Sequence, residues 1–111
     1  MVNIDFKIDA NNIAEIKKAT AGAVSKALEE IGMMAEGYAK MLCPVDTGNL
    51  RNSITHEQED ERTEAVGSAV EYAAYVEMGT QKMKAQPYLE PAITNHISEY
   101  QSIVEETLHN A

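Results

Sequence analysis

Residues 12–42, NIAEIKKATAGAVSKALEEIGMMAEGYAKML, carry the pattern that decides the fold. The apolar positions advance in steps of three and four, which places them in one stripe along a long helix. The stripe consists of Ile13, Ile16, Thr20, Val24, Ala27, Leu28, Ile31, Met34, Tyr38 and Leu42. Gly22, Gly32 and Gly37 each weaken such a helix by about 1 kcal/mol relative to alanine. They indicate close packing against another backbone, or a bend, and Pro44 ends the helix.

The N-terminal residues and the segment after Pro44 predict a small antiparallel sheet. Residues 2–8 (VNIDFKI) alternate apolar and polar side chains, which is the period of a strand with one buried face. Residues 50–58 (LRNSITHEQ) and 63–68 (TEAVGS) predict a hairpin around the charged tip EDER at residues 59–62. Residues 71–80 (EYAAYVEMGT) fit either a short helix or a further strand, closed by Gly79 as a C-terminal stop.

A second long helix is predicted from Pro87 onward, after a loop at residues 81–87. Pro91 falls in its first turn, where a missing N–H costs nothing. Its apolar face contains Leu89, Ile93, Ile97, Tyr100, Val104 and Leu108. The order of elements predicts one α+β domain over residues 1–111, with a small antiparallel sheet packed against two long helices.

The formal net charge of −9 restricts the partners that the chain can bind. Phosphate binding needs clustered Lys and Arg, so we expect no specific nucleic-acid binding and no docking on an anionic membrane. An acidic wall could still line a conduit for DNA, because repulsion keeps a polyanion from adhering to it. The core lacks Trp and has one Phe, so assembly with other copies would help to bury apolar surface.

Cys43 is the one cysteine of the 111 residues. A lone cysteine fits a reducing compartment, and we expect it to be a buried, unreactive thiol. No stretch resembles a signal peptide or approaches the roughly 18 apolar residues of a membrane span. The sequence therefore predicts a soluble protein of a cytoplasm.

Asp46-Thr47-Gly48 is the tripeptide that carries the catalytic carboxylate in aspartic proteases. A dimeric protease of that kind needs apolar strands around two such carboxylates that share a proton. Here the tripeptide follows a predicted helix and precedes the polar residues NLRNSI. We interpret Pro44, Asp46, Thr47 and Gly48 as a structural turn, in which Gly48 permits a positive φ before the next strand.

Other candidates for catalysis or metal binding are weak. The adjacent acids Glu29–Glu30 and Glu105–Glu106 point apart on a helix, so we expect them to be solvated. His96 and Glu99 could bind a metal from the last helix, but no second ligand pair accompanies them in the sequence. No phosphate-binding glycine loop or nucleophile elbow is present. We therefore expect no cofactor and no enzymatic activity.

Three segments together resemble a family of small phage tail components. They are CPVDTGNLRNSI (43–54), VGSAVEYAAYVEMGT (66–80) and KAQPYLEPAI (84–93), and the resemblance covers roughly residues 35–97. It implies a structural virion protein that completes the tail or joins heads to tails in long-tailed phages and prophages. It also implies a ring of copies between the head connector and the tail tube or tail terminator, with assembly in the host cytoplasm.

A ring requires one patch to contact a different patch on the next copy. We expect the loop GTQKMKAQP (79–87) to form one side, because it carries a basic pair and has methionines nearby as adaptable apolar contacts. The candidate interface residues are Met78, Gly79, Thr80, Lys82, Met83, Lys84 and Pro87. The tip EDER is a candidate for the other side or for a tail partner. Both segments are equally compatible with plain solvent loops.

A second interpretation remains open at this point. The chain could be an intracellular adaptor or regulatory binding module without enzymatic activity, with the long helices as its docking surface. Isolation of the gene beside a host regulatory operon would favour this alternative. Neighbouring genes for a portal, a connector and a major tail protein would favour the virion.

Overall fold

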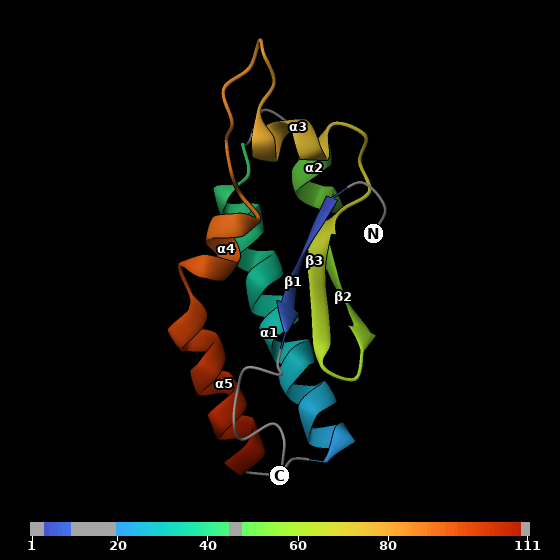
Figure 1. Cartoon of the computed structure of the whole chain (residues 1–111), viewed down its shortest axis with the longest axis vertical. Coiled ribbons are helices and arrows are strands. Elements are labelled where there is room, and N and C mark those ends of the chain that lie inside the picture. The colour runs from blue at the N-terminus through green and yellow to red at the C-terminus, as the bar shows by residue number, and fades with distance from the viewer. Residues whose placement is uncertain (1–3, 10–19, 45–47, 110–111) are drawn as a thin grey trace.

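The sheet of the computed structural model has three antiparallel strands in the order β1-β3-β2 (Figure 1). The structure describes residues 4–9, 20–44 and 48–109. β1 (Ile4–Asp9) pairs with β3 (Thr63–Ser68), with Ile4 opposite Ser68. β2 (Thr55–Asp60) is the other neighbour of β3, and its register shifts between Gln58 and Asp60. The sheet and the helices confirm the predicted α+β class.

Helix α1 (Ala21–Leu42) covers one face of the sheet and contacts both β2 and β3. Thr20 has an extended backbone, and its hydroxyl accepts a hydrogen bond from the N–H of Ala23 at 3.2 Å. It therefore caps the helix, so the described helix begins at Ala21 and does not run through Thr20 as the stripe predicted. Residues 12–19 of the predicted helix lie outside the described residues. At the other end, the N–H of Cys43 donates a hydrogen bond to the carbonyl of Ala39, which completes the last turn. Pro44 follows.

The predicted stripe of α1 forms the centre of the core. Its buried members are Val24, Ala27, Leu28 and Ile31. Further along, the buried positions are Ala35 and Ala39, whereas the predicted members Met34 and Tyr38 are half-buried and Leu42 is exposed. Ile4, Leu50, Ile54, Val66, Tyr88, Leu89 and Val104 complete the cluster from the other elements. The single cysteine, Cys43, is buried in the same cluster, as predicted.

The predicted hairpin is present, but the start of its first strand was predicted wrongly. Residues 48–53 form the helix α2 (Gly48–Ser53), and the strand begins at Thr55. Leu50 and Ile54 are both buried, and a spacing of four residues places both on one side of a helical turn. The Ser53 hydroxyl donates to the carbonyl of Leu50 at 2.6 Å, which stabilises the end of this turn. The charged tip is a hairpin turn, as expected, with Glu61 and Arg62 between the strands.

The C-terminal half contains two helices where one long helix was predicted. The short helix α3 (Ala73–Met78) settles the alternative that was open for residues 71–80, and Gly79 ends it with a φ of 77°. After the loop come α4 (Glu90–Thr94), with Pro91 in its first turn, and α5 (Ile97–His109). The helix is interrupted at Asn95 and His96. α5 runs alongside α1 (Figure 1), and none of the described helices is both long and apolar enough to span a membrane.

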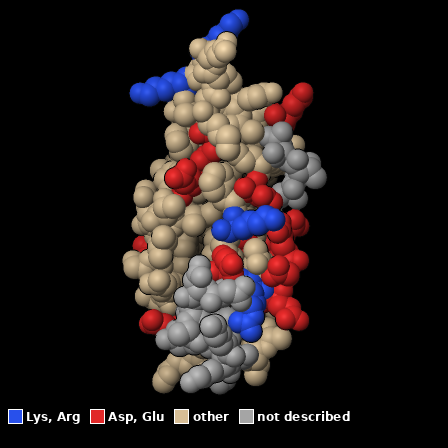
Figure 2. Space-filling model, in the orientation of Figure 1, with Lys and Arg blue, Asp and Glu red and all other residues tan. Residues whose placement is uncertain are grey.

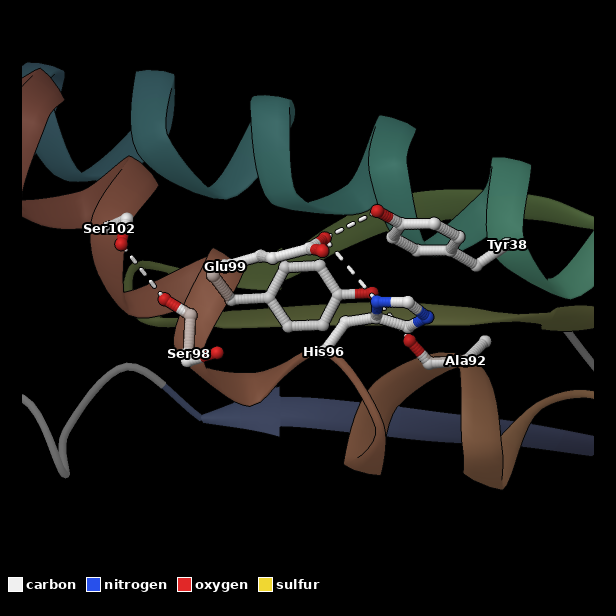
Figure 3. Close-up of polar contacts among 7 residues, drawn as sticks. Tyr38, Ala92, His96, Ser98, Glu99 and Ser102 are labelled. Atoms are coloured by element: carbon white, nitrogen blue, oxygen red, sulfur yellow. Dashed lines mark hydrogen bonds and ion pairs between the residues drawn. The ribbon is translucent and has the colours of Figure 1, made fainter.

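Polar contacts join α5 to α1 (Figure 3). The ring of His96 stacks on Tyr38 with centroids 3.5 Å apart, and the Tyr38 hydroxyl donates a hydrogen bond to Glu99. This bond lowers the pKa of Glu99 and raises the pKa of Tyr38, because it stabilises the charged carboxylate and the neutral phenol.

The molecule is elongated, with extents of 48 × 23 × 21 Å.

Candidate assembly surface

The three segments that carry the resemblance meet at one end of the molecule, where α2, α3, the loop after α3 and α4 lie together (Figure 1). The first and second segments are joined by the hydroxyls of Ser53 and Ser68, which lie 2.6 Å apart. The second and third segments are joined by Tyr88, whose hydroxyl donates to the carbonyl of Ala73 at 3.0 Å. Burial raises the pKa of Tyr88, with a further contribution from the charge of Glu77. The phenol therefore stays neutral and available as a donor.

Glu77 is the polar centre of this end. Its side chain is buried on α3 and points at the start of α4. Oε1 accepts hydrogen bonds from the backbone N–H groups of Tyr88 at 3.0 Å and Leu89 at 2.8 Å, and Oε2 accepts from Glu90 at 3.2 Å. These N–H groups precede or open α4 and have no partner within the helix. A carboxylate at this position satisfies them and interacts favourably with the helix dipole.

The loop between α3 and α4, residues 79–87, has a defined path. Gly79 adopts a left-handed φ of 77°, and a Cβ at this position would lie 2.7 Å from the backbone nitrogen of Ala85. The N–H of Gln86 donates to the carbonyl of Val76 at 2.8 Å, and Thr80 N–H donates to Met83 at 2.8 Å. The loop is therefore held at its base and again nearer its tip, and Glu77 fixes the residues that follow it.

This loop presents a basic tip. Lys82 and Lys84 are exposed, and basic side chains project from the end of the molecule in Figure 2. Met78 is 67% exposed, whereas Met83 is half-buried and packs against the core. Of the two predicted apolar contacts, Met78 is thus the one that the surface offers to a partner. Thr80 and Pro87 are also exposed.

Further exposed apolar side chains lie at the same end of the molecule. Tyr75 on α3 is 57% exposed, and Met41 and Leu42 at the end of α1 are 76% and 45% exposed. The C-terminal end of α1 lies at the same end of the molecule as α3 and the loop (Figure 1). We use the name basic loop surface for residues 78–87 together with these three side chains.

The edge strand β2 presents the opposite charge. Glu57, Glu59, Asp60 and Glu61 are all exposed on β2 and its turn, and acidic side chains gather along that edge in Figure 2. Lys7 from β1 forms an ion pair with Glu59 at 2.8 Å, which neutralises one of the four acidic charges. We call these four acids the acidic edge.

The predicted turn at residues 44–48 is described only at its ends. Pro44 follows α1 and is half-buried, while Asp46 and Thr47 lie outside the described residues. Gly48 is the first residue of the helix α2, so the turn leads into a helix and not into a strand as predicted. The turn role of Asp46 therefore stays a prediction.

The other sequence candidates form ordinary contacts. His96 and Glu99 lie 3.3 Å apart and contact Tyr38, so they connect α5 to α1. Glu29, Glu30, Glu105 and Glu106 are exposed, as expected. Of the three helix glycines, Gly32 closely approaches side chains of the sheet, whereas Gly22 and Gly37 face open space. Close packing against another backbone was expected at all three glycines. It is found only at Gly32 among them, and there the neighbours are side chains.

Two buried acids were missed by the sequence reasoning. Neither Glu77 nor Glu64 was singled out from the sequence. Both carried a signal, because the period of each element places them on its buried face next to Val76 and Val66. A buried carboxylate needs donors or a counter-charge, so such positions mark polar centres.

Comparison with protein families identifies the group to which the chain belongs. Residues 10–79 match the HK97-gp10-like family model, described as "Bacteriophage HK97-gp10, putative tail-component". Because the match covers more than half of the chain, the protein belongs to this family of phage tail components. Such a component is part of the virion. The third segment of the resemblance lies beyond the matched residues, and neither the curated proteins nor the solved structures gave a match.

Proposed function

We propose that this tail component completes the tail or joins it to the head, as a ring of copies at the head–tail junction. The observation that carries the proposal is the pairing of a structured basic loop surface with an acidic edge elsewhere on the same chain. Patches of opposite charge on one molecule favour head-to-tail contacts between copies. When the rotation between copies closes, such contacts form a ring.

The contact between copies combines three contributions. Lys82 and Lys84 supply charge, and Met78 and Tyr75 supply apolar area. Backbone hydrogen bonds hold the loop, and Glu77 fixes the residues that follow it, so little ordering entropy is lost on docking. The net charge of −9 repels copies at long range. The basic loop is thus the part of the surface that selects an acidic partner.

Connector and tail tube or tail terminator proteins are the proposed partners on the two faces of the ring. In this proposal the protein acts through shape and contact, without catalysis. Assembly takes place in the host cytoplasm, and the finished ring lies in the virion at the head–tail interface.

The test is charge reversal in the loop. Lys82→Glu with Lys84→Glu places acids against acids, which costs several kcal/mol at a contact and reduces joining of heads to tails by about 100-fold or more. Joining is measured as infectious particles formed when purified protein is added to heads and tails that lack it. Lys26→Glu is the matched control, since Lys26 is exposed near the opposite end of α1.

The monomer must remain folded in every variant, which circular dichroism checks. Mass measurement of the purified protein, alone and with its connector, shows whether a closed ring forms. An unchanged particle yield for the double reversal, or an equal loss for Lys26→Glu, contradicts the proposal.

A further inference from the structure

Three side chains from three elements converge between α1 and the β2–β3 hairpin. They are Glu29 on α1, His56 on β2 and Glu64 on β3. Their donor atoms all lie within 4.8 Å of one another. His56 Nδ1 and Glu64 Oε2 are the closest pair, at 2.7 Å. The cluster lies away from the basic loop surface and has no part in the contacts proposed above.

Glu64 is the unusual member. Its side chain is completely buried, and Oε1 has no hydrogen-bond partner among the described residues. A buried carboxylate with an unpaired oxygen is costly unless a cation or a donor compensates it. His56 supplies one contact to Oε2, so half of the carboxylate remains to be compensated.

The side chains of Glu64 and His56 closely approach the backbone of α1 at Gly32. A Cβ at Gly32 would lie 2.2 Å from Glu64 Oε2 and 2.4 Å from His56 Nδ1. Any other residue at position 32 would therefore displace the pair. The two donor atoms lie this close to the helix backbone because residue 32 is a glycine.

The local charge favours a cation. The carboxylates of Glu29 and Glu57 are near enough to Glu64 to interact with its charge, so acidic groups gather at this point. Two carboxylates and one imidazole supply the oxygen and nitrogen ligands that first-row divalent metals bind. Glu29 is exposed, which gives an ion a route from solvent.

We propose that Glu29, His56 and Glu64 bind one divalent transition-metal cation, with Zn²⁺ as the best match to this donor set. Zinc bonds of about 2.0–2.2 Å separate the ligands of one ion by roughly 3–4 Å. The exposed Glu29 side chain closes inward, and the His56–Glu64 pair opens slightly. The bound ion links helix α1 to both strands of the hairpin, and solvent supplies the remaining ligand.

The experiment uses the full chain, freed of metal with a chelator and titrated with Zn²⁺. Calorimetry is expected to show one Zn²⁺ bound per chain, with a rise in the melting temperature. In NMR spectra, the ring signals of His56 shift on addition of one equivalent, and those of His96 and His109 do not. Shifts at His96 or His109 in place of His56, or no binding, overturn the proposal.

Glu29→Gln and Glu30→Gln form the matched pair of variants. Both residues are exposed neighbours on α1, so both variants fold, and glutamine can still accept the Thr107 hydrogen bond that Glu30 receives. Glu29→Gln is expected to weaken Zn²⁺ binding by about tenfold or more, a loss of the size seen when groups supporting a metal are removed. Glu30→Gln is expected to leave it unchanged. Equal affinities for the two variants show that the cluster is not the site.

Discussion

At the residue scale, the glycines of α1 differ in what surrounds them. A Cβ at Gly32 would collide with Glu64 and His56, whereas a Cβ at Gly37 would meet nothing within 4 Å. The two positions lie in the same helix and differ by little more than one turn. Their substitution therefore separates the effect of crowding from the effect of helix propensity.

We expect Gly32→Ala and Gly37→Ala to change stability in opposite directions. Overpacking at position 32 exceeds the helix-propensity gain and lowers the free energy of unfolding by about 1–2 kcal/mol. Gly37→Ala raises it by up to about 1 kcal/mol, because alanine restricts the unfolded chain and fits the helix. Urea denaturation followed by far-UV circular dichroism measures both. A gain in stability at position 32 would mean that the Glu64–His56 pair relaxes at no cost.

At the scale of elements, the attachment of α4 depends on one carboxylate. Glu77→Gln keeps the size of the side chain but replaces one acceptor oxygen with a donor that faces backbone N–H groups. Loss of charge-assisted bonds in a buried site is expected to lower the free energy of unfolding by about 2–3 kcal/mol. Urea denaturation measures the loss, and hydrogen exchange at Tyr88, Leu89 and Glu90 is expected to quicken.

Glu71→Gln is the control for that substitution, since Glu71 is exposed just before α3 and its change should stay within about 0.5 kcal/mol. An effect at Glu77 as small as at Glu71 would show that solvent replaces these bonds without loss.

Elements with a regular local period were predictable from the sequence. β1 and the described part of α1 followed from alternation and from the apolar stripe, because burial of one face depends on neighbours along the chain. The break between α4 and α5 was not predictable, since the apolar stripe continues through it. There, the N–H of His96 donates to the carbonyl of Ile93, and the Tyr100 hydroxyl donates to the carbonyl of Ala92. The side chain of Tyr100, eight residues farther along the chain, thus replaces the backbone hydrogen bond that the Ala92 carbonyl would accept within a continuous helix.

The candidate surface was predictable in part for a similar reason. Exposure of Lys82 and Lys84 followed from their polarity in a loop, whereas the inward turn of Met83 depends on packing against the core. The anchoring bonds of Glu77 join residues that are 11 to 13 positions apart. Helical and strand periods relate residues only a few positions apart, so they do not predict such pairs. The residues of the proposed metal site are still farther apart in the sequence, because they join α1 to two strands.

At the scale of the whole molecule, charge is divided between the loop end and the β2 edge of an elongated shape. If each copy places its basic loop against the acidic edge of the next, exchanging charges within one chain restores opposite charges at the exchanged positions, Lys82 and Lys84 in the loop and Glu59 and Glu61 at the edge. The exchanged variant carries Lys82→Glu and Lys84→Glu together with Glu59→Lys and Glu61→Lys. The ion pair of Lys7 with Glu59 is lost, but an exposed pair contributes at most about 1 kcal/mol to stability.

We expect the exchanged variant to recover most of the joining that the loop reversal alone abolishes, because the repulsion of acids against acids is removed. The variant with Glu59→Lys and Glu61→Lys alone is expected to fail, since it places bases against bases. Infectious particle yield in the reconstitution assay ranks the three variants, and raising the salt concentration is expected to narrow their differences. If the exchanged variant joins no better than the loop reversal, the basic loop contacts a different protein, and the acidic edge is not its partner.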